Sequence, residues 1–136
     1  MLIGVTGDTH NNLKNISKIC DLFNQTNPSL VIHTGDVTLP KSLAAFSKLK
    51  MPLICVFGNN DKLEKKGLME EAKKFDCSFY EEPHKIEVDQ KEIIIIHHPE
   101  LINEEMILNA DFILHGHTHR YRSVSYTHLR AHETES

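Results

Sequence analysis

Short apolar runs recur along the chain and are separated by polar stretches rich in turn-forming residues. Their length and their content of Val and Ile are typical of buried strands rather than of helices. We expect strands at residues 2–5, 30–32, 53–57, 93–96 and 112–114. Apolar positions with helical spacing fall between the first three, and this alternation over residues 1–58 predicts right-handed βαβ units and a parallel sheet.

The first predicted helix has its apolar face on residues 13–23. It begins after a capping Asn11 or Asn12 and ends at Asn27-Pro28, because proline cannot continue a helix. Two further helices are predicted, one between Pro40 and Pro52 and one over residues 68–75.

The pattern changes after Cys77, where short strands are expected close together at residues 78–80, 85–88 and 91–96. Asp89-Gln90 is a candidate tight turn between the last two, so this half is predicted to be antiparallel. A further helix is expected over residues 101–108, with Met106, Ile107 and Leu108 facing inward.

The length of 136 residues suits a single domain. We place that domain at residues 1–122 and expect residues 123–136 to be a tail that is foreign to it or disordered, because this stretch has no clear period and ends in polar residues. A frayed native terminus is the alternative. His128 and His132 are therefore left out of the site.

Composition narrows the range of partners. A formal charge of −4 gives no cationic field for bulk nucleic acid, so a small anionic substrate would need local positive charge, which bound metal could supply. Three separated cysteines indicate neither a disulfide framework nor a thiolate zinc site. No signal peptide and no apolar stretch of about 20 residues is visible, so we expect a cytoplasmic protein without a membrane span.

Polar residues capable of chemistry follow the five apolar runs at residues 2–5, 30–32, 53–57, 93–96 and 112–114. The clusters are Asp8-Thr9-His10, Gly35-Asp36, Gly58-Asn59-Asn60-Asp61, His97-His98 and Gly116-His117-Thr118-His119. Strands that end at one edge of a sheet bring such groups together where open α/β folds have their ligand crevices. We interpret the set as a metal site whose ligands come from separate segments of the chain.

The donor types suit two transition-metal ions. Asp8 and His10 are two positions apart and project to the same side of an extended segment. A carboxylate has two oxygens and can bridge, which favours Asp36 as a ligand shared by cations about 3.5 to 4 Å apart. Mixed nitrogen and oxygen donors without thiolate favour Mn²⁺, Fe or Zn²⁺ over Ca²⁺ or Mg²⁺.

Each cluster taken singly also has a structural interpretation. Asp8 alone is typical of a helix cap, Asp36 of a turn, and residues 58–61 of a turn with left-handed positions. His97 alone would be a strand-end histidine. Only the ordered set indicates a site.

The ordered set resembles the calcineurin-like metallophosphoesterases, especially their small single-domain prokaryotic phosphodiesterases. The likeness covers roughly residues 1–122. It implies a four-layer αββα sandwich, whose second sheet we expect to be incomplete at the C-terminus. It also implies hydrolysis of small phosphate esters by a hydroxide that bridges two divalent ions, with Mn²⁺ expected and Ni²⁺, Fe or Zn²⁺ as alternatives.

The resemblance also assigns roles to residues. Asp8, His10, Asp36 and His119 would hold the first metal, and Asp36, Asn59, His97 and His117 would hold the second. Asp36, Asn59 and His98 are the candidates for catalytic roles.

Three departures from the family pattern stand out. Asn60 occupies a position where many members have a His that protonates the leaving group, and an amide is no general acid near neutral pH. His97-His98-Pro99 replaces the common His-Gly-His; His97 is the preferred ligand because it comes first after the apolar run, whereas a shift to His98 would reverse the facing. The strands that usually follow the last motif are not recognisable, which predicts an exposed sheet edge.

Two other functions stay open from the sequence. One is a non-catalytic scaffold of the same fold that binds protein partners, and the other is a phosphomonoesterase. The expected partner of the leading hypothesis is a small phosphate ester, and a homo-oligomer stays open. His33 and His115 are either groups that orient ligands or contact phosphate, or residues that pack at strand ends.

Overall fold

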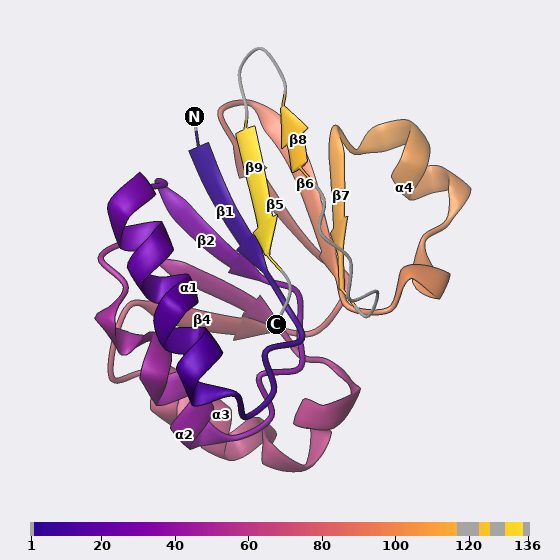
Figure 1. Ribbon diagram of the computed structural model, residues 1–136. Helices are drawn as coiled ribbons and strands as arrows, with labels where there is room; N and C mark the ends of the chain where they lie inside the picture. Colours follow the sequence, from indigo (N-terminus) through magenta and orange to yellow (C-terminus); the bar gives the residue numbers. More distant parts are fainter. Residues whose placement is uncertain (1, 117–122, 126–129, 135–136) are drawn as a thin grey trace.

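Two β-sheets lie face to face, with helices α1, α2 and α3 outside the larger sheet and α4 beside the smaller one (Figure 1). The computed structural model describes residues 2–116, 123–125 and 130–134, the last two segments through their backbone only. The layer order is therefore helix, sheet, sheet, helix, as the resemblance implied.

The larger sheet has the strand order β4-β3-β2-β1-β9-β8. Its first four strands are mutually parallel: β1 (Leu2–Thr6), β2 (Leu30–His33), β3 (Leu53–Val56) and β4 (Cys77–Tyr80). Strand β9 (Arg130–Thr134) runs parallel to β1, and β8 (Ser123–Ser125) is antiparallel to β9. The parallel arrangement predicted for residues 1–58 is confirmed.

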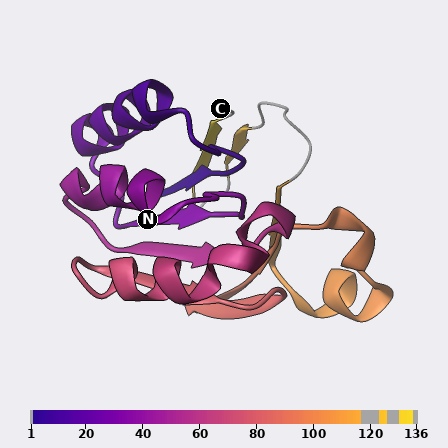
Figure 2. The same ribbon diagram turned by 90° about the horizontal axis from the view of Figure 1, so that it is seen from below.

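Crossover helices connect the parallel strands, as seen from below in Figure 2. Helix α1 (Leu13–Thr26) begins after Asn12, whose side chain accepts a hydrogen bond from the Asn15 amide, and ends at the left-handed Asn27. Helix α2 (Pro40–Ala44) continues into the 3₁₀ turn η1 (Ala45–Lys48). The 3₁₀ turn η2 (Asn59–Glu64) leads into α3 (Lys65–Ala72).

The smaller sheet contains β5 (His84–Val88), β6 (Lys91–Ile96) and β7 (Phe112–His115) in that order. Asp89 and Gln90 join β5 to β6 with positive φ angles of 52° and 64°, which confirms the predicted tight turn. The 3₁₀ turn η3 (Pro99–Leu101) and helix α4 (Glu104–Asn109) lie between β6 and β7.

Two hydrophobic cores hold the layers together. Helices α1 to α3 pack on the outer face of the larger sheet through residues such as Ile16, Phe23 and Leu68. The two sheets pack on each other through a second cluster that includes Val5 and Ile95.

The expectation that the half after Cys77 is antiparallel is wrong for two of the three pairings that strands β4 to β7 make. Strand β4 pairs parallel with β3, because α3 serves as a crossover between them. Strand β7 likewise pairs parallel with β6, since the connection through η3 and α4 is long enough to return the chain to the same end of the sheet. Only β5 and β6 form the predicted antiparallel pair.

The expectation that Met106, Ile107 and Leu108 all face inward is also wrong. Ile107 is 64% exposed and Leu108 is 80% exposed. Helical residues rotate by about 100° each, so three consecutive side chains cannot share one face.

Strands β8 and β9 lie in the stretch expected to be a tail. The boundary after residue 122 stays a prediction. Within the described part of the chain, no helix is long and apolar enough to cross a membrane.

Candidate metal centre

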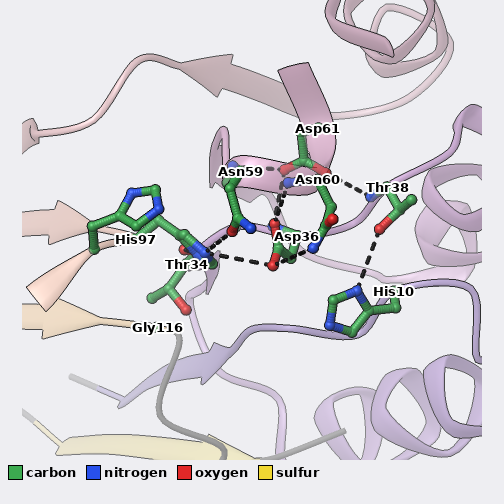
Figure 3. Close-up of polar contacts among 12 residues, drawn as sticks. His10, Thr34, Asp36, Thr38, Asn59, Asn60, Asp61, His97 and Gly116 are labelled. Atoms are coloured by element: carbon green, nitrogen blue, oxygen red, sulfur yellow. Dashed lines mark hydrogen bonds and ion pairs between the residues drawn. The ribbon is translucent and has the colours of Figure 1, made fainter. Parts of the chain in front are cut away.

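The carboxyl ends of β1, β2, β3 and β6 bring four of the predicted clusters to one edge of the sandwich. Asp8 and His10 follow β1, Asp36 follows β2, Asn59 opens η2 after β3, and His97 follows β6. Figure 3 shows His10, Asp36, Asn59 and His97 gathered around one centre. His117 and His119 lie outside the described residues.

Asp8, His10 and Asp36 form the first group of donors. Each offers one ligand atom, and these atoms all lie within 4.8 Å of one another. Both carboxylates are buried, with Asp8 5% and Asp36 1% exposed. Buried carboxylates and an imidazole in this arrangement are donors that suit a divalent first-row cation.

The backbone at this group takes an uncommon conformation. Asp8, His10 and Asp36 have φ angles of 51°, 48° and 66°, in the left-handed region that side chains rarely adopt. Two hydrogen bonds hold the loops together: Asp8 N–H donates to Gly35 O (2.9 Å) and His10 N–H donates to Asp36 O (2.8 Å). Left-handed backbone at three donors is the kind of strain that clusters at functional sites.

Asn59 and His97 form the second group, which also reaches Asp36. His97 Nε2 lies 2.9 Å from Asn59 Oδ1 and 3.5 Å from Asp36 Oδ2. His97 Nδ1 lies 2.8 Å from the Thr34 carbonyl; a ring that donates from Nδ1 to that carbonyl has its Nε2 lone pair available to a cation at the centre. A lone pair and two oxygens then converge, which is a donor set that fits a cation.

Asp36 is the member common to both groups, and Asn60 holds its carboxylate. The Asn60 amide N–H donates to Asp36 Oδ1 (2.9 Å), and the side-chain Nδ2 donates to Oδ2 (3.0 Å). Each oxygen thus keeps a fixed direction. The residue that replaces the family's histidine therefore contacts the carboxylate that we expect to bridge.

Asp61 is a buried carboxylate that sequence reasoning grouped with the motif without giving it a role. It accepts from the backbone N–H groups of Asp36 (2.9 Å), Gly58 (2.8 Å) and Thr38 (2.6 Å). Burial raises the pKa of Asp61, although these three hydrogen bonds oppose the rise. Its position in the first turn of η2, reaching back to Gly58, is a local capping signal that could have been recognised.

His97 and His98 point in different directions, with their rings perpendicular to each other. His97 is fully buried toward Asp36, whereas the His98 ring pairs with Glu82 at 2.7 Å. Burial alone would raise the pKa of Glu82, but hydrogen bonds from both histidines hold it below its usual range. The catalytic role of His98 stays a prediction. Sequence reasoning missed Glu82, which no motif marks.

His33 and His115 lie beside the centre. His33 is fully buried, with Nε2 2.9 Å from Thr9 Oγ1 and with Nδ1 accepting from the Gly35 amide (3.0 Å). Burial lowers the pKa of His33 to about 3, so its ring is neutral. His115 Nδ1 lies 3.3 Å from Gly116 O. His33 therefore contacts the loops after β1 and β2, which carry proposed ligands, and the role of either histidine in orienting a ligand stays a prediction.

Two glycines allow the loops to approach this closely. Gly35 has a φ of 111°, and a Cβ there would lie 2.6 Å from His97 Nδ1. A Cβ on Gly58 would lie 2.3 Å from Asp36 Oδ1. Larger residues at either position would displace a proposed ligand.

Comparison with known proteins decides the family. The sequence pattern of the calcineurin-like phosphoesterase superfamily domain matches residues 1–132. The chain belongs to this superfamily. It is 33% identical over 123 residues to phosphodiesterase MJ0936 of Methanocaldococcus jannaschii, a match that covers 88% of this chain and 74% of that protein.

Solved structures agree with this family. An archaeal phosphodiesterase superposes with a TM-score of 0.79 at 29% identity, over 96% of this chain and 81% of that one. The phosphoesterase YfcE of E. coli has a TM-score of 0.66 at 16% identity, over 98% of this chain and 79% of that one, and shares the fold. Membership implies divalent metals and supports a hydrolase of phosphate esters.

Proposed function

We propose that the protein is a phosphodiesterase that depends on two divalent metal ions and hydrolyses small phosphate esters. Asp8, His10, Asp36 and His119 hold the first ion, and Asp36, Asn59, His97 and His117 hold the second. Mn²⁺ is the proposed metal. The observation that carries the proposal is the position of Asp36, which belongs to both described donor groups.

The bound ions would supply positive charge and Lewis acidity for activating water and offsetting the charge on the phosphoryl group. The chain's own residues orient those donors. The Thr34 carbonyl is an acceptor for a proton on His97 Nδ1, and Asn60 donates to both oxygens of Asp36. These contacts hold the metal-binding side chains in place before the cations and the anionic substrate bind.

Hydrolysis joins the oxygen of water to phosphorus and breaks the bond from phosphorus to the leaving oxygen, which must then gain a proton or leave as an anion. The Asn60 side chain cannot supply that proton, and it donates its amide hydrogen to Asp36 instead. Esters with a good leaving group, such as aryl phosphodiesters, are therefore the expected substrates.

The test compares the wild-type protein with Asp36→Asn on an aryl phosphodiester with Mn²⁺. The substitution keeps the side-chain shape but removes the charge shared by both groups, so we expect hydrolysis to fall at least about 100-fold and Mn²⁺ binding in calorimetry to weaken. Asp21→Asn is the matched control, because Asp21 is exposed on α1 and pairs with Lys48. It should leave both readings unchanged.

Other outcomes separate the alternatives. Wild-type protein that is folded and loaded with a first-row divalent ion but hydrolyses no phosphate ester would contradict the proposal and favour a scaffold. Faster turnover of an aryl monoester than of the diester would favour a phosphomonoesterase. The cytoplasmic location and the absence of bulk nucleic acid as a partner stay predictions from composition.

A further inference from the structure

Glu82 contacts the second donor group from a separate part of the chain. It lies in the connection between β4 and β5, fifteen positions before His97. Its Oε1 accepts from the backbone N–H groups of His97 and His98, both at 2.9 Å. Its Oε2 lies 2.7 Å from the Nδ1 of His98. One carboxylate thus holds two consecutive peptide groups and one ring.

The pairing of β5 with β6 explains why Glu82 is there. The register pairs His84 with Ile95, so continuing it by two residues places Glu82 opposite His97. The paired ladder ends at His84. The Glu82 side chain provides the acceptor that the His97 amide uses beyond the end of that ladder.

The direction of the His97 ring depends on this contact. Side chains of neighbouring residues in an extended segment point to opposite sides, so a change in the backbone at residues 97–98 would exchange the two rings. Glu82 engages the His98 ring, while the Thr34 carbonyl engages Nδ1 of the His97 ring, which is perpendicular to it. Together these contacts select the orientation in which His97 Nε2 faces Asn59 and Asp36.

We propose that Glu82 is a positioning residue that holds the His97–His98 segment so that His97, and not His98, reaches the metal centre. The inference rests on the proposed function in so far as His97 is a ligand there. It also accounts for the presence of His98 where the family commonly has a glycine, because the side chain at 98 has a charged partner outside the centre.

The test measures Mn²⁺ binding by calorimetry in full-length wild-type protein and in Glu82→Ala, Glu82→Gln and His98→Ala variants. Loss of an outer contact to a metal ligand typically weakens affinity about 10- to 100-fold, and this is the expected effect of Glu82→Ala. Glu82→Gln retains an acceptor oxygen for the two amides and should recover most of the affinity. His98→Ala removes the contacts of the ring with Glu82 and with the His97 ring but keeps both backbone hydrogen bonds to Glu82, so it should have a smaller effect than Glu82→Ala.

Glu81→Gln is the matched control, because Glu81 is the adjacent acid and pairs with Lys65 rather than with the histidines. It should bind Mn²⁺ as the wild type does. A Glu82→Ala variant that is less stable to heat yet binds Mn²⁺ with wild-type affinity would overturn the inference, since Glu82 would then only brace the loop.

A second readout needs no metal and separates this inference from the proposed function. In metal-free wild-type protein, NMR of the histidine rings should show a proton on His97 Nδ1 that is hydrogen-bonded to the Thr34 carbonyl. Glu82→Ala should lose that signature and Glu82→Gln should keep it. An unchanged His97 signal in Glu82→Ala would refute the positioning role, whatever the activity of the wild type.

Discussion

His33 shows how a single buried residue supports the loops of the centre without being one of the proposed ligands. It contacts Thr9 in the loop after β1 and Gly35 in the loop after β2, and it packs edge-on against Phe46. Desolvation is the main cause of its low pKa, and the nearby His97 lowers it further. The neutral ring therefore holds the two loops together: Nδ1 accepts from the Gly35 amide, and Nε2 donates to Thr9 Oγ1.

The neutrality of His33 predicts a loss of stability in acid. Its pKa falls from 6.5 in the unfolded chain to about 3 in the fold, so the unfolded state binds the proton more readily. The contribution of the neutral His33 ring to the free energy of unfolding is fully present above pH 6.5. It is lost at about 1.4 kcal/mol per pH unit as the pH falls toward 3.

Urea unfolding of metal-free protein at pH 7.5 and pH 5 measures this effect. His33→Gln cannot titrate, so its stability should fall by about 2 kcal/mol less than that of the wild type over this interval. An equal fall in both proteins would show that His33 is not the group responsible.

One short element, the turn from β3 into η2, contacts both donor groups. Asn59 faces His97, Asn60 holds the Asp36 carboxylate, and Asp61 holds the Asp36 amide. Gly58 allows this turn to lie against Asp36, whose amide nitrogen would be 2.6 Å from an added Cβ. Three successive side chains thus depend on the close approach of one glycine.

Gly58→Ala is expected to lower Mn²⁺ affinity at least about tenfold and to cost about 1–3 kcal/mol of stability, because the added methyl group must displace the Asp36 backbone and carboxylate. Calorimetry and urea unfolding measure the two effects. Gly67→Ala in α3 is the control: its Cβ meets side-chain atoms of Pro40 and Glu64 and none of the proposed donors, so it should affect stability but leave Mn²⁺ affinity unchanged. Equal affinities for Gly58→Ala and the wild type would contradict this account of the turn.

The whole molecule places the centre where two sheets meet. One core joins the helices to the larger sheet, and another joins the two sheets through residues such as Val5 and Ile95. Asp8, Asp36 and Asn59 come from the larger sheet, whereas His97 comes from the smaller one. A cation bound by both groups therefore links the two sheets.

Metal binding is expected to stabilise the fold, because the donors converge only in the native state. At a free Mn²⁺ concentration 100 times its dissociation constant, the gain is about 2.7 kcal/mol and should disappear when a chelator is added. Urea unfolding with and without Mn²⁺ measures this gain. Asp36→Asn should show little of it, and a similar gain in that variant would mean that Mn²⁺ binds elsewhere.

The local chemistry of the chain is readable in its sequence. Runs of β-branched residues predicted the positions of β1, β2 and β3, because strands buried on both faces need a continuous apolar sequence. Asn11 or Asn12 predicted the helix start, where the structure has Asn12 as the cap, and Asp89-Gln90 predicted the tight turn, since capping and left-handed backbone depend on single side chains. The donor types and their place after strands were likewise visible.

The tertiary structure decided which strands pair with each other and which side chains face the core. The parallel pairing of β4 and the exposure of Leu108 depend on which surfaces other elements cover. The contact of Glu82 with His97 and the contact of Asp61 with Asp36 could not be inferred, because these partners lie 15 and 25 positions away along the chain. A sequence specifies which donors are present through side-chain chemistry, but only the packing of two sheets determines which of them face one centre, because that depends on register and burial over the whole chain.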